Sequence, residues 1–130
     1  MKNVFLVFLL CISGLNISMG NTIRVPQDYS TIQSAIDNSL EGDTIIVSRG
    51  TYVENINFRG KGIVLTSEYL FTNNVEDIEQ TIIDGSQATN PDSASCVLMY
   101  RLEQSSSLDT SAALIGFTLT GGKGTAWEDE

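Results

Sequence analysis

The most regular pattern of apolar and polar positions lies between residues 31 and 40. Apolar side chains recur there at steps of three and four residues, which places them on one face of a helix. They are Ile32, Ala35, Ile36 and Leu40. Ser30 or Thr31 can cap the first turn, and Gly42 can end the helix. The pattern predicts one amphipathic helix over Thr31–Leu40, and we expect no second helix after residue 20.

The rest of the chain is a series of short strand-like runs separated by turns. They are β-branched or alternate apolar with polar positions, as strands with one buried face do. The runs are Thr22–Val25, Thr44–Ser48, Glu54–Phe58, Ile63–Thr66, Thr81–Gly85, Val97–Tyr100 and Leu114–Thr120. In the last run we expect Ile115, Phe117 and Leu119 to face one way. The polar segments between runs are expected to be irregular loops, namely Glu68–Gln80, Gln87–Ser95 and Glu103–Ser111.

The spacing of these runs favours a repeating architecture. Their apolar cores begin near positions 45, 63, 82, 97 and 115, at steps of 18, 19, 15 and 18 residues. Such a loose period is typical of a solenoid, in which like strand stacks on like strand. Two-residue hairpin signals are nearly missing, with Asp84-Gly85 as the single instance. A small antiparallel sandwich is the alternative that this pattern leaves open.

The first twenty residues have the pattern of a secretory signal. Lys2 precedes nine unbroken apolar residues, Val4–Ile12, and the small residues Ser18 and Gly20 follow. A membrane anchor would need about 20 apolar residues, so nine are too few. We therefore expect cleavage before Asn21, export, and no membrane insertion afterwards. The remaining 130 − 20 = 110 residues allow one domain.

Composition and charge exclude several classes of function. After removal of the leader the chain keeps 6 basic and 16 acidic residues, a net charge of −10, and it has no histidine. This balance argues against nucleic acid and anionic lipid as partners. The missing histidine excludes a Ser-His-Asp triad and every zinc site that uses histidine.

Two longer segments of the chain contain recognisable motifs: Ile23–Ile36 contains x-Y-x-T-I-Q-x-A-I, and Gly42–Ile56 contains G-D-T-I-x-V-x-x-G-x-Y-x-E-x-I. These motifs resemble those of right-handed parallel β-helix proteins of the pectate-lyase-like and pectin-methylesterase-like superfamily. Thr81–Gly85 and Leu114–Gly122 are similar to later coils of such secreted bacterial proteins. The resemblance implies an all-β solenoid in which the helix Thr31–Leu40 caps the first of two to three coils within residues 21–130.

The resemblance also implies how the chain ends. Residues 121–130 stop where another coil would begin, so we expect a truncated product, a fragment, or a subunit that pairs through its open C-terminal coil. The exposed edge of Ile115, Phe117 and Leu119 would otherwise favour aggregation.

Several residues in the first coils have an architectural interpretation. Gly50 permits a corner that a Cβ would hinder, and Tyr52 can stack on the coil with its hydroxyl kept polar. Glu54 and Asn55 can be interpreted as an acid and its partner, but hydrogen bonding at a corner is the favoured interpretation. Asp84 is interpreted as a corner residue that bonds its own backbone.

No catalytic, cofactor-binding or metal-binding residue is assigned. Enzymes of the resembled superfamily use paired aspartates with an arginine, or calcium with a basic arginine, on later coils that are absent here. Asp37, Asp43 and Glu54 belong to the cap end. Calcium is the metal that the oxygen-rich composition suits best, but no calcium-loop motif is present.

The remaining acidic runs and two single residues are interpreted as having structural and not catalytic or binding roles. Glu76–Glu79 and Glu128–Glu130 are interpreted as solvated charge and not as ligand sites. Cys96 is interpreted as a buried thiol and not as a nucleophile, because no histidine can activate it. Trp127 is interpreted as a packing or fraying residue and not as a sugar-stacking platform.

These observations predict a secreted, periplasmic or cell-surface β-helix protein without a complete active site, associated with carbohydrate. One alternative is the N-terminal part of a polysaccharide lyase or carbohydrate esterase whose catalytic coils lie elsewhere. A surface adhesin or structural spacer is the other. The expected partners are a polysaccharide or a second copy of the chain, although the net charge of −10 fits an acidic polysaccharide poorly.

Overall fold

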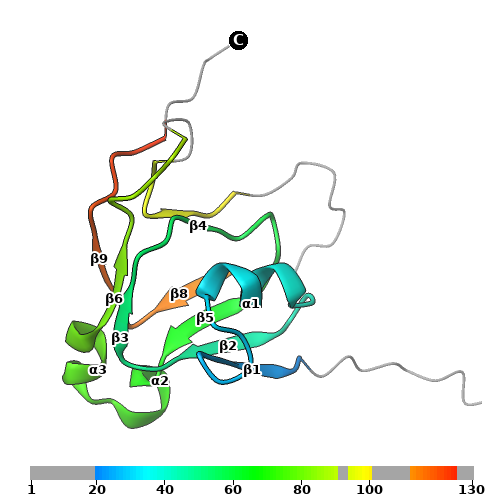
Figure 1. Cartoon of the computed structure of the whole chain (residues 1–130). Helices are drawn as coiled ribbons and strands as arrows, with labels where there is room; N and C mark the ends of the chain where they lie inside the picture. The colour runs from blue at the N-terminus through cyan, green and yellow to red at the C-terminus, as the bar shows by residue number, and fades with distance from the viewer. Residues whose placement is uncertain (1–19, 91–93, 101–111, 126–130) are drawn as a thin grey trace, which may run out of the picture.

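The computed structural model describes residues 20–90, 94–100 and 112–125. Its strands are β1 (Thr22–Val25), β2 (Thr44–Val47), β3 (Gly50–Tyr52), β4 (Ile56–Asn57), β5 (Val64–Ser67), β6 (Thr81–Asp84), β7 (Val97–Leu98), β8 (Ala113–Ile115) and β9 (Thr118–Thr120). Its helices are α1 (Ile32–Asn38), α2 (Tyr69–Thr72) and α3 (Val75–Gln80). The described part of the chain is therefore rich in strands, with few and short helices (Figure 1).

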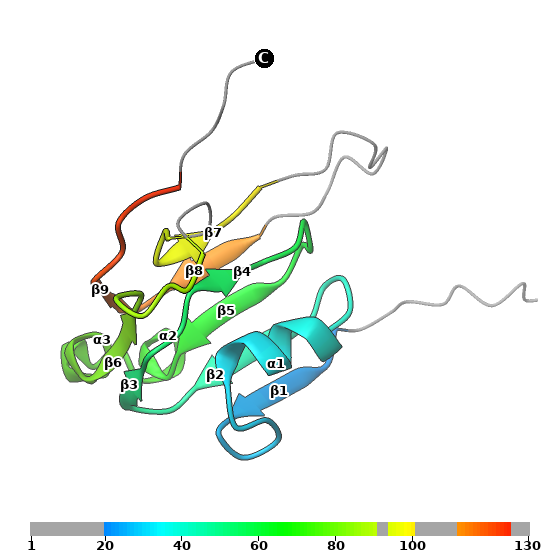
Figure 2. The same ribbon diagram turned by 45° about the horizontal axis from the view of Figure 1, so that its top comes forward.

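All of these strands pair in parallel, in three sheets. The strand order is β1-β2-β5-β8 in the first sheet, β3-β6-β9 in the second and β4-β7 in the third. The chain visits the sheets in the same order twice, as β2, β3, β4 and then β5, β6, β7, and β8 and β9 begin a third round. Figure 2 shows the first sheet stepping from β1 to β8. Parallel pairing throughout argues against the antiparallel sandwich.

The core is built from apolar side chains that repeat in register on neighbouring strands. In the first sheet the matched positions are Ile23, Ile45, Leu65 and Leu114. Ile56 of β4 and Ile83 of β6 add to the core from the other two sheets, as does Phe58, which follows β4. Because parallel strands lie about 4.8 Å apart, each layer of side chains covers the one before it.

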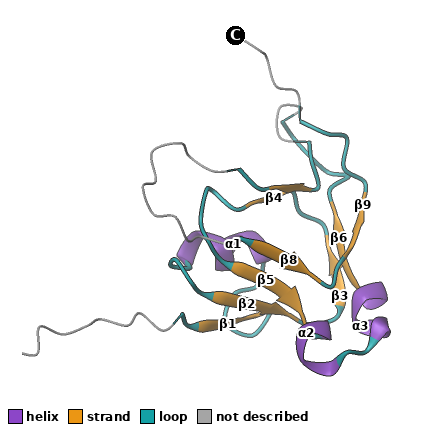
Figure 3. Ribbon diagram, turned by 180° about the vertical axis from the view of Figure 1, so that it is seen from behind, coloured by secondary structure: helices purple, strands orange, loops and turns teal. Residues whose placement is uncertain are grey.

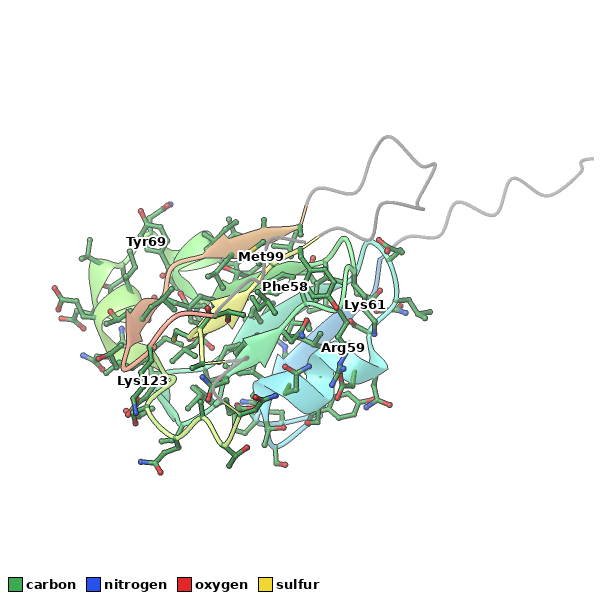
Figure 4. All side chains as sticks on the ribbon, turned by 90° about the horizontal axis from the view of Figure 1, so that it is seen from above. Phe58, Arg59, Lys61, Tyr69, Met99 and Lys123 are labelled. Carbon is green, nitrogen blue, oxygen red and sulfur yellow. The ribbon has the colours of Figure 1, made fainter. Side chains whose placement is uncertain are left out.

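Helix α1 is shorter than the sequence predicts. Thr31 caps it as expected, but it ends at Asn38, and Ser39 is already extended. The Lys61 ammonium group caps the C-terminal end of the helix. Its Nζ donates to the carbonyl oxygens of Ile36 (2.6 Å), Asp37 (3.0 Å) and Ser39 (2.8 Å). Arg59 and Lys61 lie beside α1 in Figure 4.

Two consequences of this early end correct the prediction. Leu40 lies beyond the helix and is 66% exposed, so it is not part of the buried face. Gly42 does not end the helix; its φ of +83° belongs to the turn that leads into β2.

The segment Glu68–Gln80 is not an irregular loop, and the prediction of a single helix is wrong. It forms α2 and α3, which lie together at the corner between β5 and β6 (Figure 3). Asn73, with a φ of +53°, ends α2, and the Asn74 side chain caps α3 by accepting from the Glu76 backbone N–H. These two short helices are marked in the sequence only by their capping residues. They lack the three- and four-residue apolar steps on which the prediction of helices was based.

The predicted strand Leu114–Thr120 is divided into β8 and β9, which belong to different sheets. The chain turns at Gly116, whose φ is +75°. The expected common face of Ile115, Phe117 and Leu119 is therefore wrong, because alternation does not continue through a corner. Leu114 and Phe117 pack against the core instead.

The remaining strand predictions need smaller corrections. Only Ile56–Asn57 of Glu54–Phe58 and Val97–Leu98 of Val97–Tyr100 are strand. Gly50 is the first residue of β3 and not a strained corner, because its φ is not positive and a Cβ there would make only ordinary contacts. No helix in the described ranges has both the length and the apolar character needed to cross a membrane.

Candidate functional site

The two ends of the strand stack are built differently. At the end formed by β1, helix α1 packs against β1, β2 and β4 and buries Ile32, Ala35 and Ile36 completely. In Figure 2, α1 lies across this end, while β7, β8 and β9 lie at the other. The first end is therefore covered by a helix, as the sequence predicts.

Corner side chains hold this cover in place. The Glu54 carboxylate accepts hydrogen bonds from the backbone N–H groups of Ile32 (2.9 Å) and Gln33 (3.1 Å) at the start of α1. The Asn55 amide donates to the carbonyl oxygens of Gly85 (3.1 Å) and Ser95 (3.0 Å) of the next layer. Both residues thus have the hydrogen-bonding role that the sequence analysis favours over an acid and its partner.

The opposite end of the stack carries partly exposed apolar side chains that lie in register with core residues. Val97 is matched to Ile56, Leu114 to Leu65 and Leu119 to Ile83, so each continues a buried row. We call Val97, Leu114, Phe117 and Leu119 the apolar end face. Val97, Leu114 and Phe117 are only partly buried, and Leu119 is 46% exposed.

A hollow of about 370 Å³ opens beside the apolar end face. Its lining consists of Ser95, Cys96, Val97, Leu119, Thr120, Gly121, Gly122 and Gly124. Cys96 is half-buried, and its thiol donates to the Ile83 carbonyl at 3.1 Å. This contact fits a packing role for Cys96.

The strand edges at the two ends also differ in charge. Within the described residues, β1 and β8 are the outer strands of the first sheet. β1 carries Arg24 and is followed by Pro26, two features that discourage edge pairing. Residues 112–122, which include β8 and β9, contain neither a charged residue nor a proline. The strand edge at this end therefore lacks the charged residues and the proline that discourage edge pairing.

An ion pair between the partly exposed Arg49 and the buried Asp77 connects the α2–α3 corner to the preceding layer. Arg49, between β2 and β3, donates through Nε to Asp77 Oδ1 at 2.6 Å and through Nη1 to Gln80 at 3.2 Å. The Thr72 hydroxyl donates a short hydrogen bond to the other oxygen of Asp77. The hydroxyl of Thr118, at the start of β9, donates to the Ile78 carbonyl at 2.8 Å. The corner is therefore held by the layers on both sides.

Asp77 corrects the interpretation of Glu76–Glu79 as solvated charge. Glu76 is largely exposed, but Asp77 is 2% exposed. The hydrogen bonds from Thr72 and then from Arg49, together with the charge of Arg49, lower the pKa of Asp77 despite its burial. The sequence alone does not show this, because Arg49 and Asp77 are 28 residues apart.

We expect Asp77→Asn to destabilise the fold at neutral pH by more than Glu76→Gln, which is expected to stay within about 0.5 kcal/mol. A lowered pKa in the folded state means that the stabilisation is complete above the unfolded pKa and is lost as the pH falls through the folded value. The difference in the free energy of unfolding between wild type and Asp77→Asn, measured by urea unfolding, is therefore expected to be complete at neutral pH and to shrink progressively as the pH falls below the ordinary aspartate value of 3.8. A difference in the free energy of unfolding that stays constant down to about pH 2 would contradict a stabilising role for the ionised Asp77 carboxylate.

The other acidic residues named from the sequence are spread over the structure. Asp84 Oδ1 accepts from the Ser86 backbone N–H at 2.9 Å, the predicted corner role. Asp37 accepts from Arg59 Nε at 2.7 Å. Burial works against the ionised form of Asp37, but Gln33, Arg59 and Lys61 together lower its pKa. Among the described residues, no group of three or more His, Cys, Asp or Glu residues is arranged to hold a metal ion.

A second hollow, of about 220 Å³, lies between the outer side of the first sheet and α2. It is lined by Arg24, Ile46, Glu68, Phe71 and Thr72. Phe71 is 62% exposed, and neither Arg24 nor Glu68 has a salt bridge within the described residues. No motif in the sequence marks these residues as a site, because they come from three separate segments of the chain.

Comparisons with protein-family models, curated proteins and solved structures found no match to this chain. Residues 1–19, which carry the predicted leader, the loop Glu103–Ser111, Trp127 and Glu128–Glu130 lie outside the described residues.

Proposed function

We propose that the chain is the capped N-terminal part of an exported right-handed parallel β-helix protein. In this proposal α1 seals one end of the solenoid, and the apolar end face receives another β-helical layer. The contribution of these residues is to start and position a longer stack. No reacting group is assigned to them.

The observation that carries the proposal is the order in which the strands visit the three sheets. β2, β3 and β4 are followed by β5, β6 and β7, each stacked in parallel on its predecessor, as successive turns of one β-helix would be. Crossovers between parallel strands of one sheet are right-handed in almost all proteins, which supports the handedness. The motifs in Ile23–Ile36 and Gly42–Ile56 support the same fold.

The apolar end face supports the second half of the proposal. Leu119 and its neighbours continue buried rows but lack a covering layer among the described residues. Unpaired strand edges and exposed inward-facing apolar side chains favour addition of a further layer. That layer can belong to the same polypeptide or to a second copy.

Sedimentation of the exported protein over a range of concentrations tests the end face. We expect its average mass to rise with concentration, and Leu119→Lys to shift this self-association to at least tenfold higher concentration. Leu40→Lys is the matched control, because Leu40 is also exposed but lies at the capped end. Self-association that is unchanged in Leu119→Lys, or equally weakened in Leu40→Lys, would contradict the proposal.

Activity and ligands beyond this architectural role stay predictions from the sequence. Association with a polysaccharide, a lyase or esterase function supplied by further coils, and an adhesin or spacer role all remain compatible with a capped β-helix. The hollow that Arg24 and Phe71 line offers a cation and an exposed ring, two features that suit a sugar, while Glu68 in the same lining disfavours an acidic one.

A further inference from the structure

Asp43 is a buried carboxylate without a cationic partner among the described residues. It is 4% exposed, and the three ion pairs in that part of the chain use Arg49 and Arg59 with other carboxylates. Asp43 Oδ2 accepts from the Leu40 backbone N–H at 2.8 Å. A buried carboxylate normally has a charged partner, because removing an ion from water is costly.

The group that faces the other oxygen of Asp43 is the backbone nitrogen of Asn21, at 2.7 Å. The position of Asn21 is fixed from its other side as well, since its carbonyl accepts from the Thr44 N–H at 2.9 Å. A separation of 2.7 Å is already that of a charge-assisted hydrogen bond. Asn21 is also the residue at which the sequence predicts the exported chain to begin.

Gly20 shows how closely the preceding residue approaches the same turn. A Cβ on Gly20 would lie 1.8 Å from the Gly42 carbonyl oxygen and 3.1 Å from the Asp43 nitrogen. Glycine is thus required at position 20 in this arrangement. It is also a small residue of the kind that a leader peptidase accepts before its cleavage point.

We propose that removal of the leader creates an ion pair between the new α-ammonium group of Asn21 and the buried Asp43 carboxylate. The proposal rests on cleavage before Asn21 and is independent of what covers the apolar end face. A leader peptidase hydrolyses the Gly20–Asn21 peptide bond with one water molecule, leaving a carboxylate on Gly20 and an amine on Asn21. This amine is protonated at neutral pH. The same nitrogen then changes from a neutral donor to a cation without moving.

The first test reads the N-terminus of the protein exported from the full-length precursor. Mass spectrometry is expected to give Asn21 as the first residue, with a free amine. Any other first residue would overturn the proposal, whatever the outcome for the apolar end face.

The second test removes the charge but keeps the shape. An acetyl group replaces the α-carbon and carbonyl of Gly20, so acetylating Asn21 fits the space that Gly20 occupies in the precursor. Acetylation is carried out on the unfolded exported protein at about pH 6.5, where an α-amine reacts in preference to lysine side chains such as Lys61 and Lys123, and mass spectrometry selects the product with a single acetyl group on Asn21. We expect acetylation to raise the unfolding equilibrium constant about tenfold at pH 7, because the hydrogen bond to Asp43 then has a neutral amide and not an ammonium group as its donor.

Two variants show whether this effect depends on Asp43. In Asp43→Asn the effect of acetylation is expected to fall below twofold. In Asp37→Asn, which removes the partner of Arg59, it is expected to remain tenfold. Equal effects of acetylation in wild type and Asp43→Asn would overturn the ion pair.

A measurement on the wild type alone covers the case in which Asp43→Asn does not fold. The α-amine of the folded protein is expected to react with acetic anhydride at least tenfold more slowly than that of the urea-unfolded protein at pH 7. Equal rates in the two states would overturn the proposal, since an amine paired with a buried carboxylate is protected.

Discussion

Replacing Leu65 with alanine is expected to lower the free energy of unfolding by about 2–5 kcal/mol, the usual cost of a cavity at a buried leucine. Leu65 is completely buried and lies between Ile45 on β2 and Leu114 on β8 in the central row of the first sheet. Its removal leaves a void in the middle of the stack, where neighbouring layers on both sides are already fixed by backbone pairing. Urea unfolding at neutral pH measures the change.

Leu40→Ala is the matched control for Leu65→Ala. The two substitutions remove the same atoms, but Leu40 is 66% exposed and lies beyond the end of α1. We expect its effect to stay within about 0.5 kcal/mol. Similar losses in the two variants would mean that Leu40 is buried, as the periodic pattern predicts, and that the early end of α1 is wrong.

These two leucines show what the sequence can and cannot predict. Leu65 is recognisable because strand burial depends on alternation within a few residues, and the β-branched runs identify most of the strands. Leu40 continues the apolar steps of α1, but Lys61, more than twenty residues later, satisfies the final carbonyls and ends the helix before it. Local patterns therefore predict elements, while distant polar partners decide where they end.

The candidate site is likewise predictable from the sequence in one part and not in another. The sequence predicts a helix-covered end and an open end, because both follow from apolar patterns and from the resemblance. It places Ile115, Phe117 and Leu119 on one face, whereas the apolar end face combines Leu114, Phe117 and Leu119 with Val97. The difference arises at Gly116, where the chain passes from the first sheet to the second.

Gly116→Ala is expected to lower the free energy of unfolding by about 2–5 kcal/mol. The φ of +75° costs about 1–2 kcal/mol for a residue with a Cβ, and overpacking adds about 1–3 kcal/mol. A Cβ at Gly116 would lie 2.5 Å from Ser67 Oγ and 2.9 Å from Tyr69 Cβ. Because β5 and α2 hold these two residues, relieving the clash requires the corner itself to shift.

Gly42→Ala separates backbone strain from the clash. Gly42 has a similar φ of +83°, but a Cβ there would meet no atom within 4 Å. Its expected loss is therefore the conformational cost alone, about 1–2 kcal/mol. If urea unfolding gives equal losses for the two variants, close packing at the Gly116 corner is refuted. A larger loss at Gly116 would mean that the β8–β9 corner packs directly against β5 and α2, the round of strands that precedes it.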